Sequence, residues 1–268
     1  MFWTRVFSAI VLGILVVFIV LQGELWVFFA LVSLVVILGI REFSGLAGSG
    51  KSLPSWILNA IIACLFCLSS FKPNWLDINL VFCLAVGLPF LIEILRRKPP
   101  SALLNISAAL LGVLYVGWLF GRHLILLRQM SDGRNLIFLL MGVTWSGDIG
   151  AYLVGMRFGK HKIIPAISPG KSVEGYLAGI VFSCVVALVF RHWLLSNIGF
   201  LHIIILGIGL AIIGQIGDLA ESLLKRGANM KDSGRIMPGH GGILDRCDSM
   251  IFIAPALYYY AIYILHLS

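Results

Sequence analysis

Nine long stretches without a charged side chain constrain this chain more than any other feature. They cover residues 6–23, 25–40, 52–71, 78–92, 99–121, 135–147, 175–190, 192–217 and 249–268. A helix crosses the hydrocarbon layer of a membrane with about 20 mostly apolar residues. Only 12% of the 268 residues are charged, against roughly 25% in an ordinary soluble domain. The pattern excludes a soluble globule, a disordered chain and a secreted disulfide scaffold.

We therefore expect an all-α, polytopic helical membrane protein with about nine transmembrane helices. Asp148 interrupts the sixth stretch before it continues to Met156, so we expect a break in that helix. The expected organisation is a scaffold of transmembrane helices over 1–134 and a catalytic region over 135–268. The catalytic region is expected to carry cytoplasmic loops at 157–174 and 220–248.

Basic residues predict the orientation. The N-terminus and the loops after even-numbered helices hold 15 of the 20 Lys and Arg residues, and the opposite side holds five. Such an excess is typical of the cytoplasmic side. We expect the N-terminus inside and the C-terminus outside. The same bias explains the net charge of +8 without a nucleic-acid partner.

Two windows, 145–174 and 218–248, concentrate the remaining polar chemistry. Together they carry seven of the twelve acidic residues and nine of the twenty basic ones. In the second window, Asp218, Glu221, Ser222 and Lys225 share one face of a helix. Charges on a membrane helix mark functional positions because exposure to lipid costs several kcal/mol. For the same reason Asp148 is a candidate site residue, with a structural ion pair as the alternative.

A glycine-rich segment, Pro238-Gly-His-Gly-Gly242, follows in the same window. Glycines let backbone N–H groups approach a phosphate closely. His240 is either a base or only part of that turn. Asp245 and Asp248 come next at i, i+3, where they would either cap a helix or serve as hard oxygen ligands for Mg²⁺.

The second window resembles the phosphatidate cytidylyltransferase family (CDP-diacylglycerol synthases). The resemblance lies in Ser222-x-x-Lys225-Arg226, Lys231-Asp232 and Pro238-x-His240-Gly241-Gly242-x-x-Asp245-Arg246-x-Asp248. The first window adds Trp145-x-x-Asp148-x-x-Ala151-Tyr152-x-x-Gly155-x-x-Phe158-Gly159 and Ser168-Pro169-x-Lys171-Ser172-x-Glu174-Gly175. One position departs from the pattern, because Gly170 stands where the family usually has a basic residue.

The resemblance implies transfer of a cytidylyl group from CTP to phosphatidate in phospholipid biosynthesis, with release of pyrophosphate. It implies Mg²⁺ with room for a second, monovalent cation, a homodimer, and a bacterial inner membrane with the active site facing the cytoplasm. The implied catalytic residues are Asp218, Lys225, Arg226, Asp245 and Arg246, and the implied metal ligands are Asp218, Asp245 and Asp248. The implied substrate-binding residues are Asp148, Ser168, Lys171, Ser172, Glu174, Ser222, Lys231, Asp232, Gly239, His240, Gly241 and Gly242.

Two other functions compete with this one. A CTP-dependent lipid kinase of the polyprenol type would also bind a nucleotide and Mg²⁺, but its alcohol acceptor requires a base. An ion-coupled transporter would use intramembrane acids such as Asp148 and Asp218, but it should show repeated halves. Elsewhere we expect only local helix ion pairs: Glu93 pairs with Arg96 and Arg97, and Arg41 pairs with Glu42.

Overall fold

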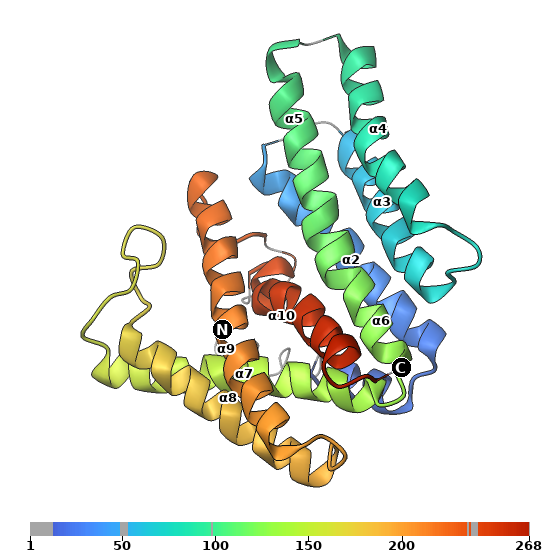
Figure 1. The fold of residues 1–268 in the computed structure, drawn as a ribbon. Helices are drawn as coiled ribbons and strands as arrows, with labels where there is room; N and C mark the ends of the chain where they lie inside the picture. The colour runs from blue at the N-terminus through green and yellow to red at the C-terminus, as the bar shows by residue number, and fades with distance from the viewer. Residues whose placement is uncertain (1–12, 49–52, 98, 235, 237–240, 268) are drawn as a thin grey trace. The chain divides into compact units, whose positions relative to one another are not determined.

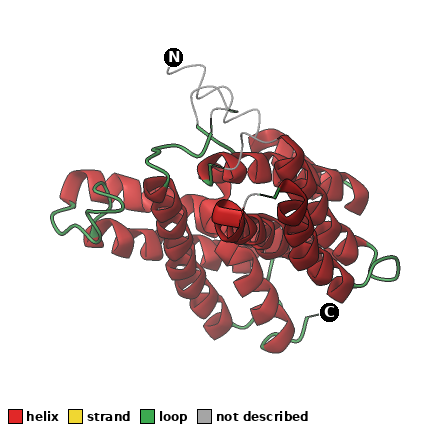
Figure 2. Cartoon of the chain, turned by 90° about the horizontal axis from the view of Figure 1, so that it is seen from above, coloured by secondary structure: helices red, strands yellow, loops and turns green. Residues whose placement is uncertain are grey.

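Helices joined by loops make up the part of the chain that the structure describes. The structure is a computed structural model that describes residues 13–48, 53–97, 99–234, 236 and 241–267. These residues form no strand; they contain one isolated bridge, between Lys162 and Ser172 (Figure 2). After a short helix at Gly13–Gln22 come α2 (Leu25–Leu46), α3 (Leu53–Phe71), α4 (Ile78–Arg96), α5 (Pro99–Gly112), η2 (Val113–Arg122), α6 (His123–Gln129), α7 (Gly133–Phe158), α8 (Val173–Trp193), α9 (Phe200–Gly227) and α10 (Leu244–Tyr263), as Figure 1 shows.

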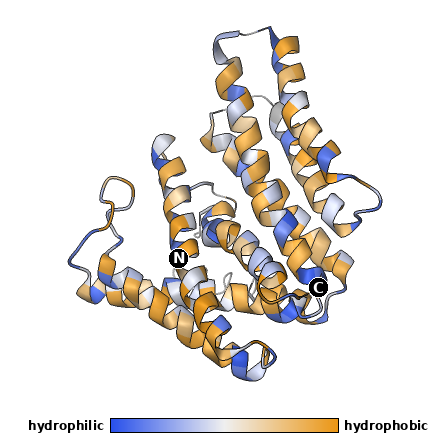
Figure 3. Ribbon diagram, in the orientation of Figure 1, coloured by the Kyte–Doolittle hydropathy of each residue, from blue (hydrophilic) through white to orange (hydrophobic). Residues whose placement is uncertain are grey.

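Each of the nine charge-free stretches contains one described helical segment. For the stretch 99–121 this segment is made of α5 and η2, which continue into α6 as Pro99–Gln129. Six of these segments are long and apolar enough to cross a membrane: Leu25–Leu46, Ile78–Arg96, Pro99–Gln129, Gly133–Phe158, Val173–Trp193 and Phe200–Gly227. Figure 3 shows the apolar colour along them, with polar residues gathered near their ends and in loops. The prediction of an all-α, multi-pass membrane protein is confirmed.

The expected break at Asp148 is wrong. Helix α7 runs continuously over 26 residues, Gly133–Phe158. A single aspartate keeps its backbone N–H and does not interrupt the hydrogen-bond ladder as proline would. The loop bounds also shift: α9 reaches Gly227, so its loop begins after that residue and not at 220, and the earlier loop covers 159–172.

The described chain divides into two compact units. One comprises residues up to Leu126 together with Gly227–Cys247, and the other comprises Leu127–Arg226 with Asp248–Ser268. In the first unit α3 contacts α2, α4 and η2. Its core holds Ile62, Phe66, Val81, Ala85 and Val113, all fully buried. The functional division at residue 134 stays a prediction.

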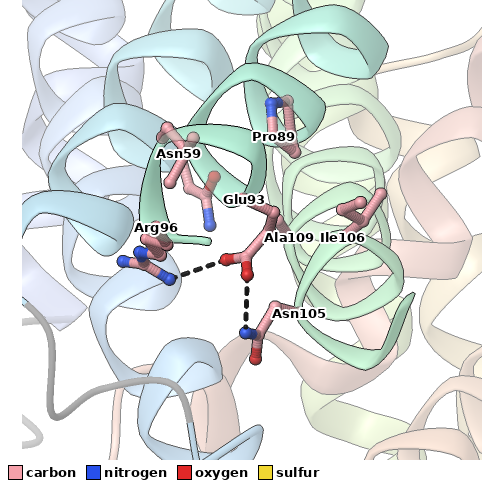
Figure 4. Close-up of a pocket in the computed structure, with 8 residues that line it drawn as sticks. Asn59, Pro89, Glu93, Arg96, Asn105, Ile106 and Ala109 are labelled. Atoms are coloured by element: carbon pink, nitrogen blue, oxygen red, sulfur yellow. Dashed lines mark hydrogen bonds and ion pairs between the residues drawn. The ribbon is translucent and has the colours of Figure 1, made fainter. Parts of the chain in front are cut away.

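The predicted Glu93–Arg96 ion pair is confirmed, with Nη1 and Oε1 2.7 Å apart. The amide of Asn105 on α5 also donates to the other Glu93 oxygen, at 3.2 Å. Figure 4 shows these groups lining a small pocket together with Asn59. Two partners on two helices let Glu93 stay 7% exposed, so the pair ties α4 to α5 and is more than a local surface contact.

Glycines allow the helices of the second unit to approach closely. A Cβ at Gly147 on α7 would lie 2.7 Å from the Ser183 hydroxyl on α8. A Cβ at Gly207 on α9 would lie 2.8 Å from the Cα of Cys184 on α8. A Cβ at Gly217 would lie 2.7 Å from the backbone oxygen of Asp248 on α10. Small residues at such crossings are how helices associate in lipid, where no hydrophobic force draws them together.

We predict that Gly207→Ala lowers the unfolding midpoint of the protein in detergent, since its new methyl group meets backbone and overpacking costs about 1–3 kcal/mol. Gly209→Ala is the matched control on the same helix, because nothing lies within 4 Å of its Cβ position. There, alanine should leave the midpoint unchanged or raise it. Equal midpoints for the two variants would contradict the α8–α9 packing.

Candidate active site

An acidic stripe on α9 meets two lysines in the second unit. Asp218 Oδ2 lies 2.5 Å from Nζ of Lys171, which comes from the loop between α7 and α8. One turn on, Glu221 Oε2 accepts a hydrogen bond from Lys225 Nζ at 2.6 Å. Glu221 is fully buried, so its charge requires this partner. Asp218, Glu221, Ser222 and Lys225 lie on one continuous helix, and the Glu221–Lys225 contact has the i, i+4 spacing of the predicted face.

Asp248, in the first turns of α10, belongs to the same cluster. It is half-buried, and the charges of Asp218, Glu221 and Asp148 act on it. Asp148 comes from α7, where it lines a small cavity with Thr144, Ser183 and other residues. Three helices therefore carry these four carboxylates, and two lysines pair with Asp218 and Glu221. We call these six residues, Asp148, Lys171, Asp218, Glu221, Lys225 and Asp248, the acidic cluster.

The loop that carries Lys171 is folded back onto the start of α8. The Glu174 carboxylate accepts hydrogen bonds from the backbone N–H groups of Lys160 and His161, at 3.2 and 3.3 Å. His161 Nδ1 also lies 2.6 Å from Glu174 Oε1. Ser172 caps α8 by accepting from the N–H of Gly175 at 3.2 Å. Both residues, expected to bind substrate, shape the loop around Lys171.

The loop between α9 and α10, in the first unit, is organised around a carboxylate. Asp245 Oδ2 accepts from the backbone N–H and the hydroxyl of Ser233, at 3.0 and 2.9 Å, and from the N–H of Gly242 at 2.7 Å. Gly241 has φ +84°, a conformation that glycine adopts without strain. A Cβ there would also approach Asp245 Oδ2 to 2.9 Å. We call the described residues of this segment, 233–234, 236 and 241–245, the motif loop.

The remaining predicted residues lie as follows. Arg226 is exposed, and its Nε donates to the carbonyl of Ile167 at 3.2 Å. Lys231, Asp232 and Arg246 are also exposed, and Ser168 and Ser222 are half-buried. Gly239 and His240 lie outside the described residues. Gly170 is exposed with nothing within 4 Å of its Cβ position, so the basic side chain usual in the family would fit there.

The acidic cluster suits Mg²⁺ in its chemistry, since its donors are hard carboxylate oxygens. The described residues contain no group of three or more His, Cys, Asp or Glu side chains arranged to hold a metal ion by themselves. Mg²⁺ ordinarily takes one or two carboxylates and completes its shell with water and substrate phosphates. Asp218 and Asp248 are two carboxylates of the kind that such a site uses, and the roles of Asp218, Asp245 and Asp248 as ligands stay predictions.

Comparison with known proteins places the chain in a family. Residues 3–264 match the cytidylyltransferase family. The chain belongs to this family. It is 38% identical to phosphatidate cytidylyltransferase of Staphylococcus saprophyticus over 207 residues, which cover 77% of this chain and 78% of the relative. It is 32% identical to the Staphylococcus aureus enzyme of that name over 94% of this chain and 96% of the relative.

A third relative, phosphatidate cytidylyltransferase of Bacillus subtilis, is 45% identical over 150 residues. That match covers 56% of this chain and 55% of the relative. The resemblance to cytidylyltransferases predicted from the motifs is thereby confirmed. The chain is a nucleotidyltransferase by family.

One buried carboxylate near the motif loop was misinterpreted from the sequence. Glu42, on α2, was expected to pair locally with Arg41, but its Oε2 accepts from the backbone N–H of Leu244 at 2.9 Å. It also lies 3.2 Å from the hydroxyl of Ser233. An acid at the end of an apolar stretch was the only available signal. Its partners, about 200 residues further along the chain, could not be found from local spacing.

We predict that Glu174→Ala loosens the 159–172 loop and speeds tryptic cleavage after Lys160 and Lys162 in detergent. The substitution removes the acceptor for two backbone N–H groups, and loops that lose such bonds become preferred sites of proteolysis. Glu24→Ala is the control, because that exposed carboxylate bonds only locally, to Trp26. An unchanged cleavage rate in Glu174→Ala would rule out this role.

Proposed function

We propose that the chain is a phosphatidate cytidylyltransferase, which converts CTP and phosphatidate to CDP-diacylglycerol and pyrophosphate. The proposal rests on the family match over residues 3–264 together with the lysine-bridged acidic cluster on α9. A phosphate oxygen of phosphatidate would attack the α-phosphorus of CTP. The bond from that phosphorus to the oxygen bridging the β-phosphate would break, and pyrophosphate would leave with its electron pair.

Charge neutralisation is the main task in this reaction, because two phosphate anions must meet. The nucleophile is already an anionic phosphate monoester and has no proton to lose, so no strong general base is required. Lys171 and Lys225 stand within reach of Asp218 and Glu221. We infer that they neutralise phosphate oxygens, with Arg226 as a third cation. Positioning by these groups is the second contribution.

Asp218 and Asp248 are the residues that would hold Mg²⁺, and Asp245 is the further candidate. The bound ion would supply neutralisation of the nucleotide phosphates and of the leaving pyrophosphate. The four carboxylates of the acidic cluster are hard oxygen donors of the kind that suits such an ion, and a second, monovalent cation remains part of the proposal.

Membrane topology completes the proposal. We infer nine membrane-crossing helices, with the N-terminus and the loops around the acidic cluster in the cytoplasm of a bacterial cell. The nine helical segments of the described residues, six of them long and apolar enough to cross a membrane, and the 15-to-5 distribution of basic residues support this arrangement. Phosphatidate would then enter from the inner leaflet, and CTP from the cytoplasm. A homodimer is the expected assembly.

The competing functions predict different products from one assay. Purified protein would be incubated with labelled CTP, phosphatidate and Mg²⁺. Release of pyrophosphate with labelled CDP-diacylglycerol supports the cytidylyltransferase. Release of CDP when a polyprenol replaces phosphatidate supports the lipid kinase, and no turnover with any acceptor supports the transporter.

We predict that Asp218→Asn and Asp248→Asn each lower the rate at least about 100-fold, as loss of a key electrostatic stabiliser does. The amide keeps the shape of the side chain and removes its charge. Asp77→Asn is the control, since Asp77 only caps α4 through the N–H of Asn79. Near-normal turnover in both cluster variants would exclude the assignment of these ligands.

We predict that a cysteine at Gly170 is shielded from an impermeant thiol reagent in intact cells, whereas a cysteine at Ser196 is labelled. Both positions are exposed, and the two loops lie at opposite ends of α8. The five native cysteines would be replaced first. The reverse labelling pattern would overturn the orientation and the cytoplasmic CTP site with it.

A further inference from the structure

The Glu42 carboxylate joins the N-terminal helices to the motif loop. It lies near the end of α2 and is 5% exposed. Its Oε2 accepts from the N–H of Leu244, the first residue of α10, at 2.9 Å, and lies 3.2 Å from the Ser233 hydroxyl. The two ends of the motif loop are therefore held by one atom on a helix about 200 residues away.

Glu42 and Asp245 share a donor. The Ser233 hydroxyl is within hydrogen-bond distance of both carboxylates, 3.2 Å from Glu42 and 2.9 Å from Asp245. A hydroxyl has one hydrogen, so the two acceptors compete for it or share it. Asp245 in turn holds the backbone at Ser233 and Gly242. A substitution of Glu42 therefore changes the hydrogen bonding of Asp245, the carboxylate that orders the motif loop.

The backbone of the motif loop is packed tightly around Glu42. A Cβ at Gly234 would overlap Glu42 Oε1, and a Cβ at Gly242 would lie 2.5 Å from Oε2. One turn before Glu42 on α2, a Cβ at Gly39 would lie 3.2 Å from a methyl group of Leu244. Helix α2 therefore approaches the start of α10 through Gly39 and the motif loop through Glu42.

The bonds of Glu42 Oε2 are those expected of a positioning group. A carboxylate oxygen makes shorter and stronger bonds to N–H groups than a neutral acceptor does. Oε2 faces both the N–H of Leu244 and the hydroxyl of Ser233.

We propose that Glu42 is a positioning residue that holds the motif loop in the conformation that binds CTP. This inference rests on the proposed function, because the motif loop is assigned to the nucleotide through that function. Glu42 acts through Ser233, Leu244 and Asp245 and does not contact substrate. It gives the N-terminal helices a part in the active site beyond that of a scaffold.

The test compares Glu42→Ala and Glu42→Gln with the wild-type protein. Glu42→Ala should raise the KM for CTP about tenfold, the ratio that one lost hydrogen bond to a charged group gives. The KM for phosphatidate should change less than about twofold, because only the nucleotide side is disturbed. Glu42→Gln keeps an oxygen that can accept from Leu244, so it should recover part of the loss.

Hydrogen exchange supplies a readout that is independent of activity. In Glu42→Ala, peptides covering residues 233–247 should exchange faster than in wild type, while peptides of α4 and α5 stay unchanged. Glu93→Gln is the matched control, since it also neutralises a buried carboxylate of the first unit, one whose partners are Arg96 and Asn105. It should lower the unfolding temperature without changing the ratio of the two KM values.

Unchanged exchange at 233–247 in Glu42→Ala would overturn the proposal, as would an equal rise of both KM values. The proposal would also be overturned if Glu42→Ala lost activity only to the extent that its unfolding temperature fell, as is expected for Glu93→Gln. Should wild type make no CDP-diacylglycerol, the proposed function fails. The exchange measurement still decides whether Glu42 orders the motif loop.

Discussion

A carboxylate placed among apolar helices keeps its charge only where a cation or several N–H groups face it. Most of the polar architecture described here follows from this requirement. Glu221 lies against Lys225 and Asp218 against Lys171. Glu93 is held by Arg96 and Asn105. The partner of each acid lies on a neighbouring turn, helix or loop. Burying the acid therefore requires that segment to pack beside it.

The same requirement also shapes the loops. Asp245 satisfies one oxygen with three donors of the motif loop, and Glu174 satisfies its carboxylate with the loop before α8. In the acidic cluster Lys171 pairs with Asp218 and Lys225 pairs with Glu221, and Asp148 and Asp248 come from two further helices. Hard carboxylate oxygens beside lysines are the groups that a site for a cation and its phosphate ligands would use.

Close helix packing supplies the geometry that the charges need. Asp248 stands beside the α9 acids because Gly217 lets α10 approach to backbone distance. The Ser172 cap, which accepts from the N–H of Gly175, and the close approach of Gly155 to Ser172 place the Lys171 loop at the start of α8. Glycine therefore acts in this protein mainly as a spacer between helices, and its conformational freedom matters chiefly at Gly241.

The sequence by itself determined the helices, because a charge-free run of membrane length has no other way to satisfy its backbone in lipid. It also determined the family, through side chains whose spacing along α9 and in the motif loop is local. Only the tertiary structure decided that α7 continues past Asp148, that Lys171 reaches Asp218, and that Glu42 holds Ser233 and Leu244. These pairings join residues far apart in the chain, and they arise from which helix faces can approach each other, which no local periodicity encodes.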